Sequence, residues 1–462
     1  MSSDEAQPRR VDQRGSARGA HLLCEGVATH ASIEPGASGA AVEAAIAPDA
    51  TAVASEAAVV ESRNPFRSPR FTRWWLASLV AGTGVGIQAV TVAIFIRDRV
   101  DLAARASAIA GALIAQSLPG ALLALFGGTV ADRIERRRIL ARTYTVAAVV
   151  SVVYVLLSAA DARAIWPIFV LGAIVGAAGA FTNPARQSML PLMVTRAQLQ
   201  NGVILGTMGF MATFQFLGPM IGGVLTDVWG LTIAFVAEVL LLAVAAYLFS
   251  GIRTEAPPRS GAGVVADLLE GVHYVVRRRE LLFLVLLAVI PGVFFMGPFA
   301  VTVPIVVPDV FRASDRWVGI LWGCFGSGLL LCSIALTFKR FRRRGFAVCA
   351  STAAAGTVLI VYSRIESLLL AVPALLVWGA CAAVFINYVV ALLQEQTEPR
   401  MMGRVMSMYS LVFFVAAPIG YAQAGAVTSL FGPQATLFSS GICATALGLA
   451  SVLLLKPVRE LE

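Results

Sequence analysis

Charged residues are scarce in this chain. Asp, Glu, Lys and Arg make up only 14% of its 462 residues, and the mean hydropathy is +0.79. A soluble protein carries roughly 25% charged residues. The apolar residues come in blocks of about 20, the length that a helix needs to cross the hydrocarbon core of a bilayer. The shortage of charge therefore excludes a string of soluble domains and predicts an integral membrane protein.

Patterns that carry catalysis, metal binding or nucleotide binding are also missing. The six cysteines form no Cys-x-x-Cys pair, and five of them lie inside apolar blocks, as small core residues do. The chain has no Gly-x-x-x-x-Gly-Lys-Ser/Thr loop, which excludes ATP as a direct energy source. It pairs no nucleophile with a base and gathers no metal ligands. We therefore expect no enzyme, no metal and no cofactor.

Positive charge exceeds negative charge, for a net charge of +9, and lies in short segments between the apolar blocks. These segments lack the interleaved aromatic residues of a nucleic-acid surface, so no nucleic-acid partner is expected. Lys and Arg instead mark the cytoplasmic loops of a membrane protein. The blocks predict twelve spans, at about 73–96, 106–131, 139–160, 164–183, 200–226, 230–251, 281–307, 315–338, 346–363, 367–392, 404–430 and 433–455.

The distribution of Lys and Arg also predicts the orientation. With the N-terminus inside, the cytoplasmic segments from Arg63 onward hold 25 of these residues and the external loops hold 7. Both termini are then cytoplasmic. We expect a monomer embedded in the lipid bilayer of the inner (cytoplasmic) membrane.

Composition divides the chain further. Residues 1–62 are rich in Ala, Ser, Glu and Gly and predict a disordered cytoplasmic tail. The longest segment between spans, 252–280, is a cytoplasmic linker with an amphipathic stretch from Val264 to Val276 that predicts a helix lying at the membrane interface. Six-helix bundles are expected over 63–251 and 281–455, followed by a short cytoplasmic tail at 456–462.

The two sets of six spans resemble each other at an offset of about 200 residues. Spans 5 and 11 each follow a glycine, contain a proline about sixteen residues later and end at a glycine turn. The matching residues are Gly202 and Gly403, Pro219 and Pro418, and Gly230 and Gly432. This order indicates a duplicated half, and such repeats place a substrate site between them.

The most specific local pattern lies at the cytoplasmic end of span 2. Gly128, Asp132 and Arg133 are followed by Arg136 and Arg137. Glycine lets two helices approach closely, and a carboxylate there can accept hydrogen bonds from the start of a neighbouring helix. We expect that neighbour to be span 11, which begins at Gly403 and Arg404. The alternative is that the arginines from Arg133 to Arg138 only set the topology.

At these residues the chain resembles the major facilitator superfamily, whose signature after span 2 is Gly-x-x-x-Asp-Arg-x-Gly-Arg-Arg. Glu135 stands where the family has its second glycine. The segments 183–191 and 394–406 look like the branch that contains the enterobactin exporter and related efflux proteins. The resemblance covers about 65–455 and implies a secondary transporter of two six-helix bundles.

Span 5 holds Gly218, Pro219, Gly222 and Gly223. Proline bends a helix and glycine admits a close neighbour. The group is similar to the core of the antiporter signature of exporters in the superfamily, and so favours export. The alternative is an ordinary packing device of membrane helices.

Charges inside the spans are rare and therefore informative. Glu238 stands about eight residues into span 6 and could bind and release a proton; a carboxylate bonded only to a neighbouring helix is the competing interpretation. Arg97, Asp98 and Asp101 at the outer end of span 1 could form an external gate, although the sequence favours solvated loop charges there.

Polar and aromatic residues near the middle or inner ends of the spans are candidates for a substrate pocket. They are Gln88, Phe181, Asn183, Gln215, Asn387, Tyr388 and Tyr409. Asn183 and Asn387 occupy similar places in the two halves, so a structural role competes evenly. Pro291, Pro298 and Pro304 should break span 7, which suits a gate.

These observations predict an exporter of a small amphipathic molecule, such as a drug, a macrolide, a siderophore or another secondary metabolite. It would work by alternating access and use protons as the coupling ion. A lysophospholipid-like substrate is the alternative within the same class. A membrane partner or sensor that keeps the fold without transport is the alternative outside it.

Overall fold

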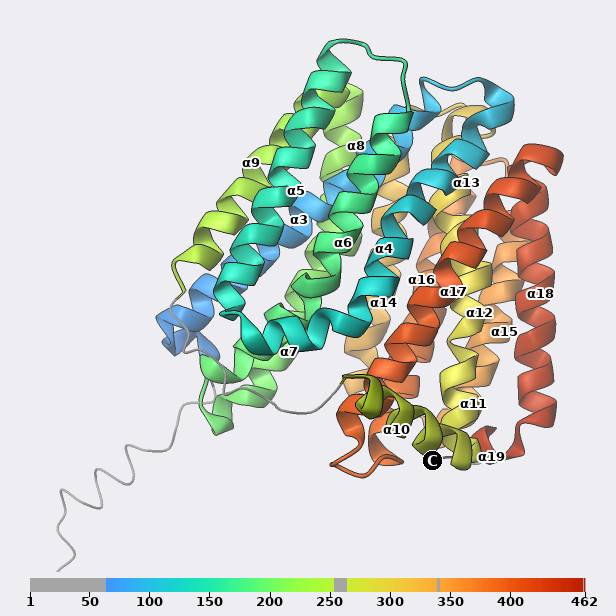
Figure 1. Cartoon of the computed structure of the whole chain (residues 1–462). Coiled ribbons are helices and arrows are strands. Elements are labelled where there is room, and N and C mark those ends of the chain that lie inside the picture. Colours follow the sequence, from blue (N-terminus) through green and yellow to red (C-terminus); the bar gives the residue numbers. More distant parts are fainter. Residues whose placement is uncertain (1–63, 253–263, 339–340, 460, 462) are drawn as a thin grey trace, which may run out of the picture. The chain divides into compact units, whose positions relative to one another are not determined.

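The computed structural model describes residues 64–252, 264–338, 341–459 and 461, with side chains described except at 124–133, 196–197, 264–269 and 457. Every regular element in these residues is a helix (Figure 1). The predicted tail 1–62 lies outside the described residues. The all-helical class is confirmed.

The main helices up to the linker are α3 (Pro69–Arg97), α4 (Arg105–Arg133), α5 (Arg136–Ala159), α6 (Trp166–Met189), α7 (Arg196–Ala212), α8 (Gly218–Trp229) and α9 (Leu231–Ser250). The linker contains α10 (Val264–Arg277). The remaining helices are α11 (Arg279–Leu287), α12 (Val289–Pro291), α13 (Gly297–Asp309), α14 (Arg316–Phe338), α15 (Arg344–Tyr362), α16 (Leu368–Glu395), α17 (Met402–Phe431), α18 (Pro433–Leu454) and α19 (Lys456–Arg459).

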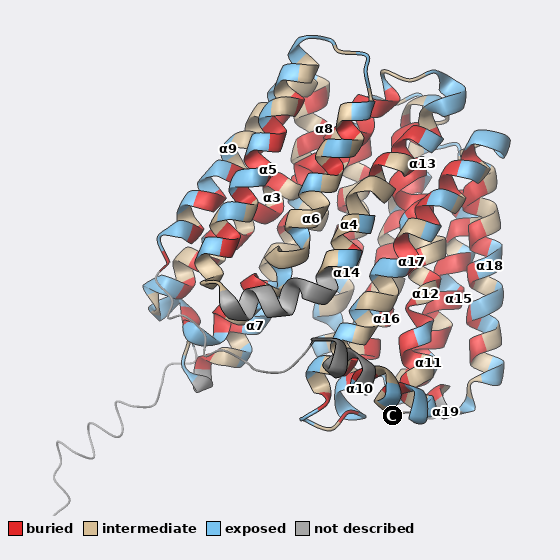
Figure 2. Ribbon diagram, in the orientation of Figure 1, coloured by how far each residue is buried: buried red, intermediate tan, exposed pale blue. Residues whose placement is uncertain are grey.

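In the part of the chain that the structure describes, twelve stretches of helix are long and apolar enough to cross a membrane, which confirms the predicted number of spans. We call α3 to α9 the first half and α11 to α18 the second half. Large apolar side chains on the outer helices are exposed, as a lipid-facing surface requires (Figure 2). Leu156, Leu240, Leu331 and Leu453 are each more than half exposed, at 61%, 61%, 64% and 69%.

Spans 5 and 7 are not continuous α-helices. A π-helical segment, Thr213–Leu217 (η4), joins α7 to α8, and a second one, Gly292–Met296 (η5), joins α12 to α13. Pro291 and Pro298 flank η5, because proline cannot donate the backbone bond that a regular helix needs. The predicted break in span 7 is confirmed between Pro291 and Pro298 but is wrong for Pro304, which lies inside the continuous helix α13. The break in span 5 directly precedes Gly218 and Pro219.

The glycine turns predicted to match between the halves have the same backbone. Gly230, between α8 and α9, has φ +86° and ψ 165°, and Gly432, between α17 and α18, has φ +86° and ψ 166°. Only glycine occupies this region without strain. Equal geometry at equivalent turns is what a duplicated half predicts.

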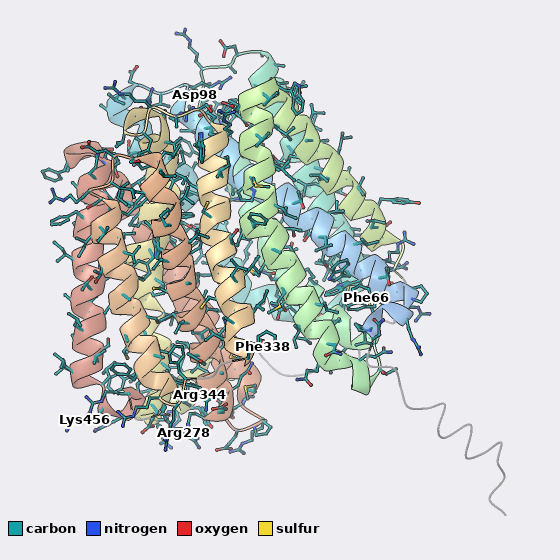
Figure 3. All side chains as sticks on the ribbon, turned by 180° about the vertical axis from the view of Figure 1, so that it is seen from behind. Phe66, Asp98, Arg278, Phe338, Arg344 and Lys456 are labelled. Carbon is teal, nitrogen blue, oxygen red and sulfur yellow. The ribbon has the colours of Figure 1, made fainter. Side chains whose placement is uncertain are left out.

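The helices have two distinguishable ends (Figure 3). Asp98 lies at one end, which we call the Arg97 end; Phe66, Arg278, Arg344 and Lys456 lie at the other, which we call the α10 end. The chain starts span 1 and finishes span 12 at the α10 end.

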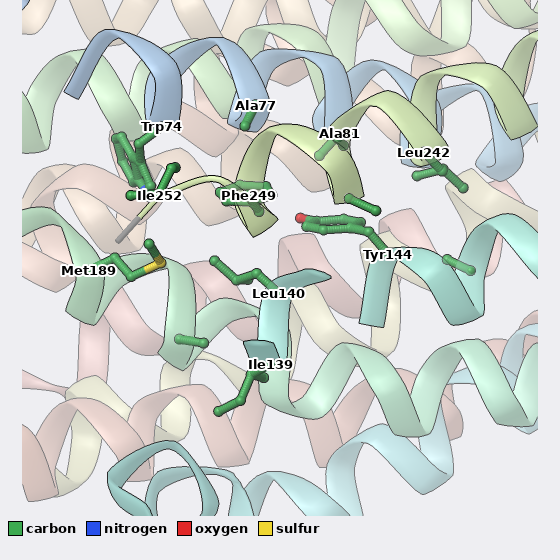
Figure 4. Packing of buried hydrophobic residues seen from close by; sticks show 14 of the residues in the cluster. Trp74, Ala77, Ala81, Ile139, Leu140, Tyr144, Met189, Leu242, Phe249 and Ile252 are labelled. Carbon is green, nitrogen blue, oxygen red and sulfur yellow. The ribbon is translucent and has the colours of Figure 1, made fainter. Parts of the chain in front are cut away.

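Four apolar clusters fill the interior, and they differ in which helices they join. At the α10 end, one cluster around Trp74, Leu140 and Phe249 lies within the first half, where Tyr144 stacks on Phe249 at 5.4 Å between ring centroids (Figure 4). A second, around Leu284 and Val405, lies within the second half and α10.

At the Arg97 end the clusters cross between the halves. One joins Ile109 and Ala110 of α4 to Ala417 and Ala424 of α17. The other joins Ile94 of α3 to residues of α13 and α14, including Val303 and Leu321. Among the described residues, the halves therefore share an apolar core only at the Arg97 end.

Candidate functional site

Ion pairs close the Arg97 end above this shared core. Arg97 donates through Nη1 to Oδ1 of Asp315 at 2.7 Å and through Nη2 to Oδ2 at 3.1 Å, a bidentate pair that joins α3 to the residue before α14. Its Nε donates to Asp98 at 2.7 Å, and Nη1 also reaches the carbonyl of Pro304 at 3.2 Å. The residue is only 6% exposed. The favoured interpretation of Arg97 as solvated loop charge is therefore wrong.

Two further pairs connect the halves around Arg97. Arg105, which begins α4, lies 3.4 Å from Asp309 at the end of α13. Arg316, which begins α14, lies 3.8 Å from Asp227 near the end of α8. The sequence did not predict these pairs because their members are about 90 to 200 residues apart along the chain. The signal that the sequence offers for them is the presence of charges of both signs at the outer ends of spans 2, 5, 7 and 8.

The Gly-Pro motif of span 5 lies where α8 packs between α3 and α14. A Cβ atom on Gly222 would stand 3.1 Å from the Ile87 backbone, and one on Gly86 would stand 2.8 Å from the Pro219 ring. On the other side, a Cβ on Gly223 would stand 2.8 Å from the backbone nitrogen of Gly319. The predicted close approach of helices is therefore present. The motif seats span 5 against span 1 and against the second half at once.

Glu238 is completely buried between α9, α5 and α3. Its Oε1 is hydrogen-bonded to the hydroxyl of Ser151 on α5, and the side chain of Gln88 on α3 lies beside the carboxyl group. Gln88 is thus brought next to Glu238. Ser151 was not singled out in the sequence, because one buried serine in an apolar span carries no distinguishing pattern.

The other pocket candidates have separate partners. Asn183 accepts from Arg186 at 3.3 Å, Asn387 donates to Ser333 at 2.9 Å, and the Tyr388 hydroxyl accepts the backbone N–H of Phe341 at 3.0 Å.

The remaining three candidates lie in helix contacts. Gln215 is in η4, where its backbone carbonyl faces Gly326 of α14. Tyr409 packs against the α10-end cluster of the second half, and Phe181 against that of the first half. Among the described residues, Gln88 and Glu238 come together, and Tyr388 and Tyr409 share the α10-end cluster of the second half.

The predicted gating motif is described only in part. α4 continues to Arg133, but the side chains of Gly128, Asp132 and Arg133 lie outside the described residues. Arg137 pairs with Glu135, the residue that departs from the family pattern, and Arg138 does so at 2.9 Å. Arg136 begins α5. The predicted contact between Asp132 and span 11 stays a prediction.

At the start of span 11, Arg404 lies 2.6 Å from Glu270 of α10. Gly403 is exposed, and a Cβ atom there would meet nothing within 4 Å. The linker helix is therefore attached to the span that the motif is expected to contact.

Two buried features were missed in the sequence. Arg186 is 4% exposed, lies over the Phe210 ring at 3.9 Å and bonds Asn183. In the second half, four aromatic side chains on α13, α14 and α16 pack together, with ring centroids 4.6 to 5.5 Å apart: Phe299, Trp322, Phe325 and Trp378. The indole Nε1 of Trp322 is buried without a hydrogen-bond partner.

Comparison with known families decides the class of protein. The family model described as "Transmembrane secretion effector", a major facilitator family, matches residues 60–462. The chain belongs to this family. The predicted resemblance to the major facilitator superfamily is confirmed, as is the prediction that the chain is a transporter and not an enzyme.

Curated relatives carry efflux names. The chain is 27% identical over 419 residues to "Multidrug efflux pump Tap" of Mycobacterium tuberculosis, covering 87% of this chain and 96% of that protein. It is 24% identical over 369 residues to "Macrolide efflux protein A" of Streptococcus pyogenes, covering 76% of this chain and 89% of that protein.

Solved structures show the same fold at low identity. The nucleoside transporter NupG aligns with a TM-score of 0.66 and 12% identity, covering 84% of this chain and 99% of that one. The human organic anion transporter MFSD10 aligns with a TM-score of 0.61 and 17% identity, covering 84% of this chain and 100% of that one. These transporters share their fold with this transmembrane secretion effector.

Proposed function

We propose that this protein exports a small amphipathic molecule by alternating access, energised by the proton gradient. One observation carries the proposal: apolar clusters and ion pairs join the halves at the Arg97 end, while each α10-end cluster stays within one half. Among the described residues the halves are thus joined at one end only, as in one of the two states of an alternating-access cycle. The opposite state would seal the α10 end.

The orientation of the chain in the membrane decides which side this conformation closes. The excess of Lys and Arg in the α10-end loops supports a cytoplasmic α10 end, with both termini inside. We also propose that the chain is a monomer in the inner membrane. The described conformation is then sealed toward the outside. An exporter in this state would take its substrate from the cytoplasm or from the inner leaflet.

The substrate class follows from the second half and from the relatives. The aromatic group around Trp322 offers ring faces and one unused N–H donor, which suits an apolar molecule with a hydrogen-bond acceptor. The names of the relatives refer to multidrug and macrolide efflux, and macrolides are molecules of this kind. We propose a hydrophobic drug or secondary metabolite as substrate.

Two parts of the chain would drive the exchange between states. The bundles 63–251 and 281–455 would rock as units, with the Gly-Pro motif of span 5 as their contact at the Arg97 end. Asp132 would accept hydrogen bonds from the start of span 11 when the α10 end closes, because a helix N-terminus offers unpaired N–H groups. Glu238 would carry the coupling proton.

The test is transport by purified protein in proteoliposomes. A panel of a macrolide, a cationic dye, a siderophore and a lysophospholipid is measured with and without an imposed pH gradient. Gradient-dependent movement of the macrolide or dye supports the proposal, and movement of the lysophospholipid alone would replace it with lipid transport. No movement of any probe, with folded protein verified by its helical circular dichroism, would favour a membrane partner or sensor.

A further inference from the structure

The polar contacts of Glu238 indicate its protonation state. Glu238, Ser151 and Gln88 come from α9, α5 and α3, and all three are at most 5% exposed. Oε1 of Glu238 is bonded to Ser151, but its Oε2 is buried and has no hydrogen-bond partner. Nε2 of Gln88 lies close enough to act on the carboxyl group, but it forms no hydrogen bond of good geometry.

The number of hydrogens available at Ser151 indicates that Glu238 carries a proton. A serine hydroxyl has one hydrogen to donate. The Ser151 hydroxyl lies 2.9 Å from the carbonyl oxygen of Ala147, one turn earlier on α5, and it also contacts Oε1 of Glu238. Carbonyl and ionised carboxylate oxygens only accept, so a single hydrogen could serve both contacts only as a shared, weaker three-centre bond. Both are satisfied when Ser151 donates to Ala147 and Glu238 donates to Ser151.

Among the described side chains, none provides a counter-charge beside Glu238. The nearby titratable side chain from α5 is Tyr154, and α3 presents Gln88 and Thr91, which are neutral. The charged groups of the packed helices lie at helix ends, where Arg97 on α3 and Asp227 on α8 are held in the ion pairs of the Arg97 end. A buried carboxylate without a cation, and with one oxygen unbonded, is strongly disfavoured. A neutral acid avoids that cost.

We infer that Glu238 is a carboxylic acid in this conformation, that its proton lies in the bond to Ser151, and that Ser151 and Gln88 are its positioning residues. Ser151 holds the protonated form. Gln88 provides the unused N–H donor that a carboxylate would require after the proton leaves for water. The inference rests on the proposed function in assigning this proton to transport.

The position of Gln88 links this proton to the gate. Gln88 lies on α3 between Ile87, which faces Gly222 of the span 5 motif, and Val90, which belongs to the core shared with the second half. Arg97 is nine residues further along the same helix, roughly 13 Å. Recruitment of Gln88 by a charged Glu238 would therefore act on the helix that carries Arg97.

The experiment is infrared spectroscopy of the protein in lipid nanodiscs, with isotope-labelled glutamate to identify the carboxyl C=O stretch. Near neutral pH the wild type should show a protonated-acid band. That band should vanish in Glu238→Gln, shift in Ser151→Ala because the hydrogen bond is lost, and persist in Glu366→Gln, whose side chain lies in an exposed loop. Glu238→Gln keeps the size of the side chain. If Glu238→Gln nevertheless folds poorly, the band shift in Ser151→Ala still tests the assignment.

A wild-type spectrum without an acid band, or a band unchanged in Glu238→Gln, would overturn the assignment. The result is independent of transport. Proton-driven export with an ionised Glu238 would remove this inference and leave the proposed function standing. An acid band in a protein that moves no substrate would support this inference and remove the proposed function.

Discussion

A buried guanidinium is stable only while its donors are satisfied, and the partners of Arg97 come mostly from the other half of the molecule. Separation of the halves at that end would remove Asp315 and the Pro304 carbonyl and leave Asp98 and water. Arg97 therefore contributes to the difference in free energy between two conformations more than to folding of either half.

Arg97→Met should shift the population toward the form that is open at the Arg97 end. We expect a change of about 2 kcal/mol, the scale of a lost charged hydrogen-bonded pair, or about 30-fold in population. The measurement is the labelling rate of a cysteine introduced at Val303, which is fully buried in the shared core, by a membrane-impermeant thiol reagent in a background without the six native cysteines.

Arg99→Met is the matched control. Arg99 leaves the same end of α3, but its partner Asp161 belongs to the first half and is 88% exposed. Breaking that pair should leave the labelling rate at Val303 unchanged. Equal acceleration in both variants would show that the Arg97 pairs do not hold the halves together.

The contrast between Arg97 and Glu238 shows what the sequence can reveal about single residues. Both are ionisable residues in or at the end of an apolar span and could be singled out for that reason. Their partners could not be predicted, because Asp315 is 218 residues from Arg97 and Ser151 is 87 residues from Glu238. Such pairs are created by helix packing, and no local pattern of residues specifies them.

At the scale of helices, the close contact between α8 and α14 depends on glycines, which have no side chain. A Cβ atom on Gly319 would overlap the carbonyl oxygen of Pro219. Because these are backbone atoms of two helices, neither can move aside alone. Any added methyl group must separate the halves or distort one of them.

Gly319→Ala should therefore disfavour the described conformation by about 1–3 kcal/mol, the usual cost of an overpacked contact. Labelling at the Val303 cysteine should accelerate. Gly179→Ala on α6 is the control, since a Cβ atom there meets nothing within 4 Å. If Gly319→Ala lowers the midpoint of thermal unfolding without changing the labelling rate, the close contact between α8 and α14 stabilises one half and is not a contact between states.

The equivalent turns allow a test of the duplication. Alanine at Gly230 or at Gly432 must adopt a backbone that only glycine enters readily, and each change should destabilise the protein by about 1–3 kcal/mol. The two losses should be similar, because the backbone angles agree. Thermal unfolding measures them, with Gly403→Ala, at a position without positive φ, as the control. A large loss in one turn only would argue against equivalent roles.

Helices were the elements that the sequence predicted best. The features that predicted them depend on neighbouring residues alone: long apolar blocks, the prolines of span 7 and the amphipathic pattern of the linker. The structure has the corresponding spans, the break in span 7 and the helix α10. The π-helical segment η4 was not predicted. Glycine and proline after it indicated a bend, but the extra residue in the turn follows from packing against α3 and α14.

For the whole molecule, closure at the Arg97 end indicates in which state the motif around Asp132, at the other end, would form its contact. In this conformation the α10-end clusters do not join the halves, so a bond between Asp132 and the start of span 11 would belong to the opposite state. Asp132→Asn keeps the shape of the side chain and removes the charge that favours a helix N-terminus. The opposite state alone should lose stability, by about 1–2 kcal/mol, since a neutral hydrogen bond replaces a charge-assisted one.

This predicts a redistribution of distances in opposite directions at the two ends. Spin labels at Arg142 and Arg400 report on the α10 end, and labels at Asp161 and Glu366 report on the Arg97 end; all four residues are exposed. In Asp132→Asn, the α10-end pair should favour its longer distance and the Arg97-end pair its shorter one. Asp132→Glu, which keeps the charge, should resemble the wild type more closely. Because the change leaves the proposed substrate contacts intact, substrate binding should persist while transport slows. Identical distributions in wild type and Asp132→Asn at both ends would show that the motif does not hold the α10 end closed.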